Sequence, residues 1–205
     1  APYGLRPEEM RGLADAFGFY YGWKTVATPG TVAALATALE RFGTKTLAQV
    51  LEPAIRLAEL GTGWPSGTRV FFQKYSWTLL DSPTVAPLYL KNGIEPFPPD
   101  ALHCNPDLAC FLRRLAAGGA NEFYRGAIAA EIEADMVANG GWVRRGDLAR
   151  LRAEIREPVR GRYRGLEVVS FPLPGRGAAV VEALGILDRF PPELLRADTP
   201  DRLHL

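Results

Sequence analysis

Side chains suited to covalent chemistry are scarce in this chain, which has two cysteines and two histidines among 205 residues. His103 directly precedes Cys104, and Cys110 follows six positions later. A thiol beside an imidazole is the arrangement of a cysteine nucleophile and its base, but two thiols and one nearby imidazole do not fill a four-ligand zinc site. No G-x-S-x-G stretch marks a serine nucleophile. We expect two free, partly buried thiols, and we assign no catalytic residue and no metal site to this chain.

Two glycine turns precede expected helices and so present free backbone N–H groups. They are "TPGT" at residues 28–31 and "PLPGRG" at residues 172–177, and neither matches a Walker A loop or a dinucleotide fingerprint. In the second turn Gly175, Arg176 and Gly177 lie between a strand and a helix start, where N–H groups and a guanidinium would meet a carboxylate. These three residues are the candidate substrate-binding turn. The alternative is a solvated arginine in a tight strand-to-helix connection.

The other charged residues do not indicate a polyanionic partner. Lysine and arginine number 24 and the acidic residues 23, so the net charge of +1 favours no nucleic-acid partner. Glu131, Glu133, Asp135 and Asp147 are expected on the solvent faces of amphipathic helices. "RVFFQKYSW" mixes basic and aromatic residues as single-strand binders do, but core packing with snorkelling basic side chains explains it more simply. No stretch reaches the roughly 18 apolar residues of a membrane-spanning helix.

Turn and cap signals predict the helices that would position these residues. Thr28 and Pro29 favour a helix start, and Gly43 its end. Thr46 and Gln49, three positions apart, predict a capping box for the next helix. That helix is expected to end at Gly61 and to kink at Pro53.

Later segments predict further helices and one long connection. Residues 62–104 are rich in proline and aromatic side chains, and we expect one helix at residues 70–80 followed by a long loop. Asn105 begins a helix that ends at two glycines, 118–119, and another helix spans residues 121–137. A short helix is expected to follow Asp147 as far as Ile155.

The apolar period then changes from helical to two. "VRGRYRG" and "LEVVSFP" are short β-type runs joined by Arg164 and Gly165, which predicts a hairpin, and residues 178–190 predict a last amphipathic helix. Since a lone hairpin is marginally stable, we expect its strands to join a larger sheet supplied by sequence outside this chain. The expected fold class is α+β, mainly helical with one β-hairpin. The chain begins at Ala1 rather than methionine, so we expect a processed or excised segment.

Five short motifs, in order along the chain, resemble the large-subunit region of the γ-glutamyltransferase (γ-glutamyltranspeptidase) family. They are "PGTVA", "AIRLAELG", "FYRG", "DLARLRAEIREP" and "YRGLEV". The stretches that carry the best match are residues 28–61 and 105–190, whereas residues 62–104 resemble the family poorly. We therefore expect residues 1–205 to be a single segment, the large-subunit portion of such an enzyme.

The resemblance implies an N-terminal-nucleophile (Ntn) hydrolase, an αββα sandwich made from one zymogen by autocatalytic cleavage. The new N-terminal threonine of the small subunit would attack a small-molecule γ-glutamyl amide such as glutathione, and the acyl group would pass to water or an amine. The partner is the small subunit of the same precursor, and no metal or organic cofactor is implied. That threonine lies outside this chain, so no catalytic residue is carried over to a position here. The family is often periplasmic, secreted or extracellular-facing, which leaves the compartment open.

The candidate turn departs from the family pattern. Where the family usually has P-P-P-S-S-G-G, this chain has "PLPGRGA" at residues 172–178, so Gly175 and Arg176 replace two small hydroxyl residues. This change favours a diverged substrate and keeps two alternatives: a diverged family member, either an acylase or an inactive paralogue, and a non-catalytic helical interaction module.

Overall fold

The computed structural model describes residues 2, 3, 5, 8, 22–63, 70, 79–80, 82–98 and 101–196. They belong to two compact units, unit 1 (Ala1–Ala153) and unit 2 (Glu154–Leu205), which are described separately. The expected helix at residues 70–80 and the "RVFFQKYSW" stretch lie largely outside the described residues.

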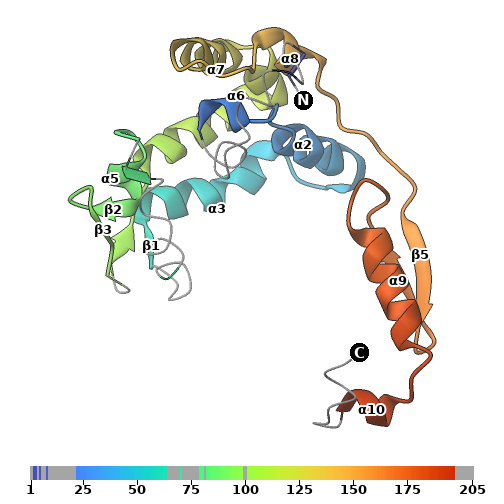
Figure 1. Ribbon diagram of the computed structural model, residues 1–205. Helices are drawn as coiled ribbons and strands as arrows, with labels where there is room; N and C mark the ends of the chain where they lie inside the picture. Colours follow the sequence, from blue (N-terminus) through green and yellow to red (C-terminus); the bar gives the residue numbers. More distant parts are fainter. Residues whose placement is uncertain are drawn as a thin grey trace. The chain divides into compact units, whose positions relative to one another are not determined.

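Unit 1 is mainly helical (Figure 1). Its helices are η1 (Trp23–Thr25), α2 (Thr31–Phe42), α3 (Leu47–Leu60), α5 (Ala86–Tyr89), α6 (Pro106–Tyr124), α7 (Ala127–Ala138) and α8 (Arg145–Arg150). α3 and α6 run beside each other (Figure 1). Ile55 and Ala58 of α3 are buried with Ala109 of α6, which closes one small core.

A larger core lies where α2, α6, α7 and α8 meet. Its buried members are Leu115, Phe123, Tyr124, Ile128, Ala129, Met136, Val143 and Leu148. α2 contributes only half-buried side chains to this core, Val32 and Ala33. The rings of Phe111 and Phe123 meet edge-on, with centroids 6.0 Å apart, a favourable aromatic geometry. This core fixes the start of α2 relative to the end of α6.

Between α3 and α6 the chain forms small antiparallel pairs instead of the expected long loop. β1 (Thr62–Gly63) pairs with β4 (Leu102–His103), and β2 (Leu90–Lys91) pairs with β3 (Glu95–Pro96). Asn92 and Gly93 both have positive φ and turn the chain from β2 to β3. The long-loop prediction was therefore wrong for this segment, because pairs of two residues are too short to show a period.

The cap signals predicted some helix ends well. Thr46 and Gln49 form the capping box, since the Gln49 N–H donates to Thr46 Oγ1 at 3.2 Å and the Thr46 N–H donates to Gln49 Oε1 at 2.9 Å. α3 ends at Gly61, which has φ 83°, and continues through Pro53. The Asn105 side chain caps α6 by accepting from the Leu108 N–H at 2.9 Å.

Other helix boundaries differ from the prediction. Gly119 interrupts α6 with φ 66°, as expected, but the helix then continues to Tyr124. The helix expected at residues 121–137 is divided by Arg125 and Gly126, which lie between α6 and α7. The apolar pattern runs on across this break and so conceals it. α8 begins two residues before Asp147 and ends at Arg150, so Ile155 lies outside it.

Unit 2 is a hairpin covered by a helix (Figure 1). β5 (Val159–Tyr163) pairs antiparallel with β6 (Leu166–Ser170), and the turn residues Arg164 and Gly165 have φ 52° and 79°, which confirms the predicted hairpin. α9 (Gly177–Leu187) packs on it, and the short α10 (Pro192–Arg196) follows. The last helix was predicted over residues 178–190, three residues too long at its end.

α9 is attached to the hairpin near both of its ends. At its C-terminus, Asp188 Oδ1 accepts from the Arg164 N–H at 2.7 Å, and an Arg164 Nη2 donates to the Phe190 carbonyl at 2.8 Å. In the middle, a Cβ on Gly161 would lie 2.4 Å from Val181 Cγ1, so glycine allows helix and strand to approach closely. Together with the N-terminal contacts of Gly177 described below, these fix the helix on the strands.

Candidate functional site

The candidate turn at residues 172–177 connects β6, which ends at Ser170, to α9, which begins at Gly177. The Gly175 N–H donates to the Pro172 carbonyl at 2.8 Å, which closes the turn. Gly177 is the first residue of α9, and no side chain of the described residues caps this helix. The sequence prediction that Gly175, Arg176 and Gly177 lie between a strand and a helix start is therefore correct in position.

Gly177 occupies a space that no other residue would fit. A Cβ built there would lie 2.2 Å from the Phe171 carbonyl oxygen, 2.5 Å from the Phe171 nitrogen and 2.7 Å from Ser170 Oγ. Two of these atoms belong to the backbone, so a side chain at Gly177 would displace α9 from the end of β6. Glycine is required here because a side chain would clash with these atoms, and not because of its backbone angles.

Arg156 lies outside the turn and donates a hydrogen bond to its backbone. An Arg156 Nη1 donates to the Leu173 carbonyl at 3.2 Å, and the same guanidinium pairs with Glu154 through Nε at 2.9 Å. Arg156 belongs to the "DLARLRAEIREP" motif and Leu173 to the "PLPGRG" turn, so a family motif and the candidate turn meet here. Sequence reasoning did not find this contact, because neither motif indicates its partner.

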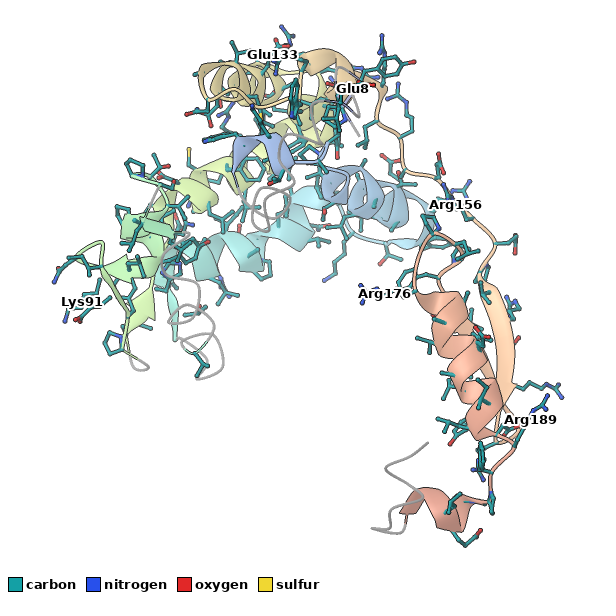
Figure 2. All side chains as sticks on the ribbon, in the orientation of Figure 1. Glu8, Lys91, Glu133, Arg156, Arg176 and Arg189 are labelled. Carbon is teal, nitrogen blue, oxygen red and sulfur yellow. The ribbon has the colours of Figure 1, made fainter. Side chains whose placement is uncertain are left out.

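Arg176 is the charged residue of the turn, and it is exposed. It occupies the N-cap position of α9 with φ −77° and ψ 4°, and its side chain lies in solvent. Figure 2 shows Arg156 and Arg176 near the start of α9 and Arg189 near the opposite end. A guanidinium beside uncapped N–H groups provides donors and positive charge for an anion. Carboxylate binding by Gly175, Arg176 and Gly177 stays a prediction.

The other glycine turn, "TPGT", is not an open anion site. α2 begins at Thr31 with Gly30 as its N-cap, so the expected cap at Thr28 was wrong. The Tyr124 hydroxyl accepts from the Ala33 N–H and donates to the Pro29 carbonyl, both at 2.9 Å. Burial raises the pKa of Tyr124, so the hydroxyl keeps its proton at neutral pH and continues to donate. A protein hydroxyl therefore satisfies the Ala33 N–H at the start of α2.

This hydroxyl also explains why two of the motifs occur together. Tyr124 belongs to "FYRG" and Pro29 to "PGTVA", and the two stretches are separated by 95 positions. Each motif is a weak signal alone because each supplies only half of the contact.

Asp147 contradicts the expected solvent position of the acidic residues. Glu131 and Asp135 are exposed as predicted, whereas Asp147 is only 9% exposed. Its Oδ1 accepts from the Tyr3 N–H at 2.6 Å, and its Oδ2 accepts from the Arg144 N–H at 2.9 Å. The carboxylate therefore ties the start of the chain to the first turn of α8.

We expect Asp147→Asn to lower the free energy of unfolding of unit 1 by about 1–3 kcal/mol. The amide would place an N–H donor against one of the two backbone donors. Urea unfolding followed by tryptophan fluorescence would measure the change. The matched control is Asp135→Asn on an exposed position, expected within about 0.5 kcal/mol of the parent. Equal midpoints for both variants would contradict the role of Asp147.

The remaining candidates do not assemble a reactive centre. Cys104 and Cys110 are free thiols and both are exposed, so the expectation of partial burial was wrong. His103 is stacked on Tyr89 with ring centroids 5.5 Å apart, and burial lowers its pKa. Among the described residues no group of three His, Cys, Asp or Glu side chains is placed to hold a metal ion. Within the same residues no helix is long and apolar enough to cross a bilayer.

Curated proteins resemble this chain over most of its length. The Acylase ACY 1 proenzyme of Pseudomonas sp. (strain SE83) is 36% identical over 185 residues, which is 90% of this chain and 33% of that protein. The Glutathione hydrolase proenzyme of Escherichia coli (strain K12) is 36% identical over 165 residues, 80% of this chain and 28% of that protein. This chain thus spans about a third of the curated relatives.

Solved structures and a family model agree with these relatives. The gamma-glutamyltranspeptidase of Helicobacter pylori matches all of this chain and 60% of its own, with a TM-score of 0.87 and 28% identity. A cephalosporin acylase from Bacillus halodurans matches with a TM-score of 0.78 and 28% identity, over 100% of this chain and 39% of its own. The Gamma-glutamyltranspeptidase family model matches residues 1–205. These findings confirm the resemblance drawn from the five motifs: the chain belongs to the gamma-glutamyltranspeptidase family.

Proposed function

We propose that this chain is the large-subunit portion of a γ-glutamyltransferase-like Ntn hydrolase. The observation that carries the proposal is the match of the family model to residues 1–205. The relatives are named proenzymes and are about three times as long as the matched segment, which supports a partner subunit cut from the same precursor.

In the proposed reaction the threonine of the small subunit attacks the γ-carbonyl of a γ-glutamyl amide. Its hydroxyl proton passes to its own α-amino group, which acts as the base, and then to the leaving amine. The C–N bond breaks and an acyl-threonine ester forms. Water or an acceptor amine then attacks the ester, releases glutamate or a new γ-glutamyl amide, and returns the hydroxyl to threonine. No metal or organic cofactor enters this sequence.

Unit 2 would contribute both a binding turn and strands to the complete enzyme. The N–H groups at the start of α9 and the Arg176 guanidinium would bind a carboxylate of the γ-glutamyl group. Within the described residues β5 and β6 pair only with each other, so both outer edges offer unpaired backbone groups. Strands from the rest of the precursor would pair with these edges and complete an αββα sandwich.

An acylase is the second candidate, and a specific observation favours it. The Acylase ACY 1 proenzyme matches this chain as well as the glutathione hydrolases do, and the "PLPGRGA" turn lacks the usual pair of small hydroxyl residues. Parallel assays of the complete precursor with γ-glutamyl-p-nitroanilide and with a glutaryl or other acyl amide would separate the two. Faster turnover of the acyl amide would assign the acylase.

We expect residues 1–205 alone to give no turnover of either amide, because the nucleophilic threonine lies on the other subunit. The complete precursor, after self-cleavage, is expected to release p-nitroaniline from γ-glutamyl-p-nitroanilide or product from the acyl amide. Release of product by the isolated chain would contradict the placement of the nucleophilic threonine on the other subunit. No release of either product by the cleaved, folded precursor would contradict enzymatic function and favour the inactive paralogue.

Arg176→Ala in the complete enzyme is expected to raise KM by about 10–100-fold, as for loss of a charge-assisted contact of roughly 1.5–3 kcal/mol. The reason is that the substrate carboxylate loses a guanidinium partner. Steady-state kinetics would measure the change, with Arg189→Ala, at the opposite end of α9, as the matched control. If both variants keep the parent KM, Arg176 is the solvated arginine of the alternative interpretation.

A further inference from the structure

Arg156 is bonded to the "PLPGRG" turn although it belongs to an earlier stretch of unit 2. Residues 151–158 form no helix or strand, so regular structure does not fix the direction of this side chain. Glu154 fixes it, because Glu154 Oε2 accepts from Arg156 Nε at 2.9 Å and also from Nη2 of the same guanidinium. With that edge of the planar group occupied, Arg156 Nη1 donates to the Leu173 carbonyl at 3.2 Å.

The turn itself contains few groups that could hold its backbone in place. Its two prolines have no N–H, and the Gly175 N–H donates to the Pro172 carbonyl within the turn. Leu173 is 71% exposed, so packing of its side chain anchors the turn little. Among the described residues, Arg156 is the only side chain that donates a hydrogen bond to the backbone of residues 172–176. The path of the turn therefore depends on an arginine outside it.

We infer, on the basis of the proposed function, that Arg156 is a positioning residue for the substrate-binding turn. By holding the Leu173 carbonyl, Arg156 keeps Arg176 and the N–H groups at the start of α9 in the arrangement that binds the substrate carboxylate. The charge of Arg156 is balanced by its ion pair with Glu154, so its guanidinium is not the partner of the substrate. Arg156 therefore acts through Arg176 and does not touch the substrate itself.

Steady-state kinetics of the complete, cleaved enzyme test this role, with whichever of γ-glutamyl-p-nitroanilide and the acyl amide is turned over faster. Arg156→Ala is expected to raise KM about three- to tenfold, as for the loss of one hydrogen bond, and to leave kcat within about twofold. The double variant with Arg176→Ala is expected to have the KM of Arg176→Ala alone, because the first residue acts through the second. The matched control is Arg160→Ala, which breaks a similarly exposed ion pair with Glu167 in the same unit and is expected to keep the parent KM.

Glu154→Ala separates positioning from direct binding by the sign of the change in KM. This variant removes the carboxylate that orients the Arg156 guanidinium, so we expect KM to rise about two- to fivefold. If Arg156 bound the substrate itself, the freed positive charge would lower KM instead. A lowered or unchanged KM for Glu154→Ala, a parent KM for Arg156→Ala, or additive effects in the double variant would each overturn the inference.

Hydrogen exchange of the turn gives a second readout that needs no activity. In Arg156→Ala we expect the amides of residues 172–177 to exchange about threefold or more faster than in the parent, while those within β5, β6 and α9 beyond its first turn keep the parent rates. Mass spectrometry of the corresponding peptides would measure both. Unchanged exchange in the turn would overturn the inference in an active or an inactive protein.

The two levels of the proposal fail in different ways. A raised KM for Arg176→Ala beside a parent KM for Arg156→Ala would remove the positioning role and keep the substrate-binding turn. A parent KM for Arg176→Ala would remove the turn as a binding site and the role of Arg156 with it. Faster exchange of the turn in a cleaved precursor that turns over neither amide would remove the proposed function, and the role of Arg156 in binding substrate would fall with it.

Discussion

Gly177→Ala is expected to lower the stability of unit 2 by about 1–3 kcal/mol, the usual cost of forcing extra volume into a packed site. The added methyl group would lie 2.2 Å from the Phe171 carbonyl oxygen and 2.5 Å from its nitrogen, and backbone atoms have no rotamer by which to move away. α9 must therefore shift from β6. Hydrogen exchange of the amides in β5, β6 and α9 would report the change as faster exchange across the whole unit.

A second glycine of α9 provides a control for which we expect the opposite change in stability. Gly185 lies inside α9, and a Cβ built there meets nothing within 4 Å. Gly185→Ala is expected to stabilise α9 by about 0.5–1 kcal/mol, because alanine restricts the unfolded chain and favours the helix. A stabilising Gly177→Ala, or equal effects of the two variants, would show that the approach of α9 to β6 is not as close as described.

Tyr124→Phe is the second change with a large expected effect, a loss of about 1–3 kcal/mol from unit 1. Removing the hydroxyl leaves the Ala33 N–H without its acceptor and the Pro29 carbonyl without its donor. The ring itself remains packed edge-on against Phe123, with centroids 4.8 Å apart, so the core is preserved. Thermal unfolding would measure the loss, and amide exchange at the start of α2 would locate it.

A conservative change elsewhere provides the comparison for Tyr124. Tyr3 is 83% exposed, and Arg150 lies over its ring at 4.6 Å, a contact that phenylalanine preserves. Tyr3→Phe is expected to leave the melting temperature unchanged. If Tyr124→Phe also melts with the parent protein, water replaces the hydroxyl at the start of α2 without cost.

Local signals were sufficient for two features whose partners lie close in sequence. The capping box at Thr46 and the hairpin turn at Arg164 are both formed within a few residues, and both were predicted. The start of α2 was not, because its N-cap is Gly30 and its Ala33 N–H donates to the Tyr124 hydroxyl of another helix. Thr28 has the right residue type for a cap, but the local pattern contains no information about Tyr124, which lies 96 positions away.

In the candidate turn, the position was predicted from the local sequence and the packing contacts were not. Its place between strand and helix follows from the glycines and the change of period, and this was predicted. The contact of Arg156 with Leu173 and the close approach of Gly177 to Phe171 depend on how the segments pack, which no residue type in the turn specifies. Asp147 was misplaced for a related reason: its acidic type favours solvent, whereas two backbone N–H groups satisfy it inside the protein.

The attachment of α9 at both of its ends restricts how this part of the family can change in length. Inserting one residue into the helix would rotate everything beyond it by about 100° and advance it by about 1.5 Å. Asp188 would then turn away from the Arg164 N–H while Gly177 stayed against Phe171. Insertions and deletions among relatives should therefore be absent between Gly177 and Asp188, and they should accumulate in the segment after Phe190.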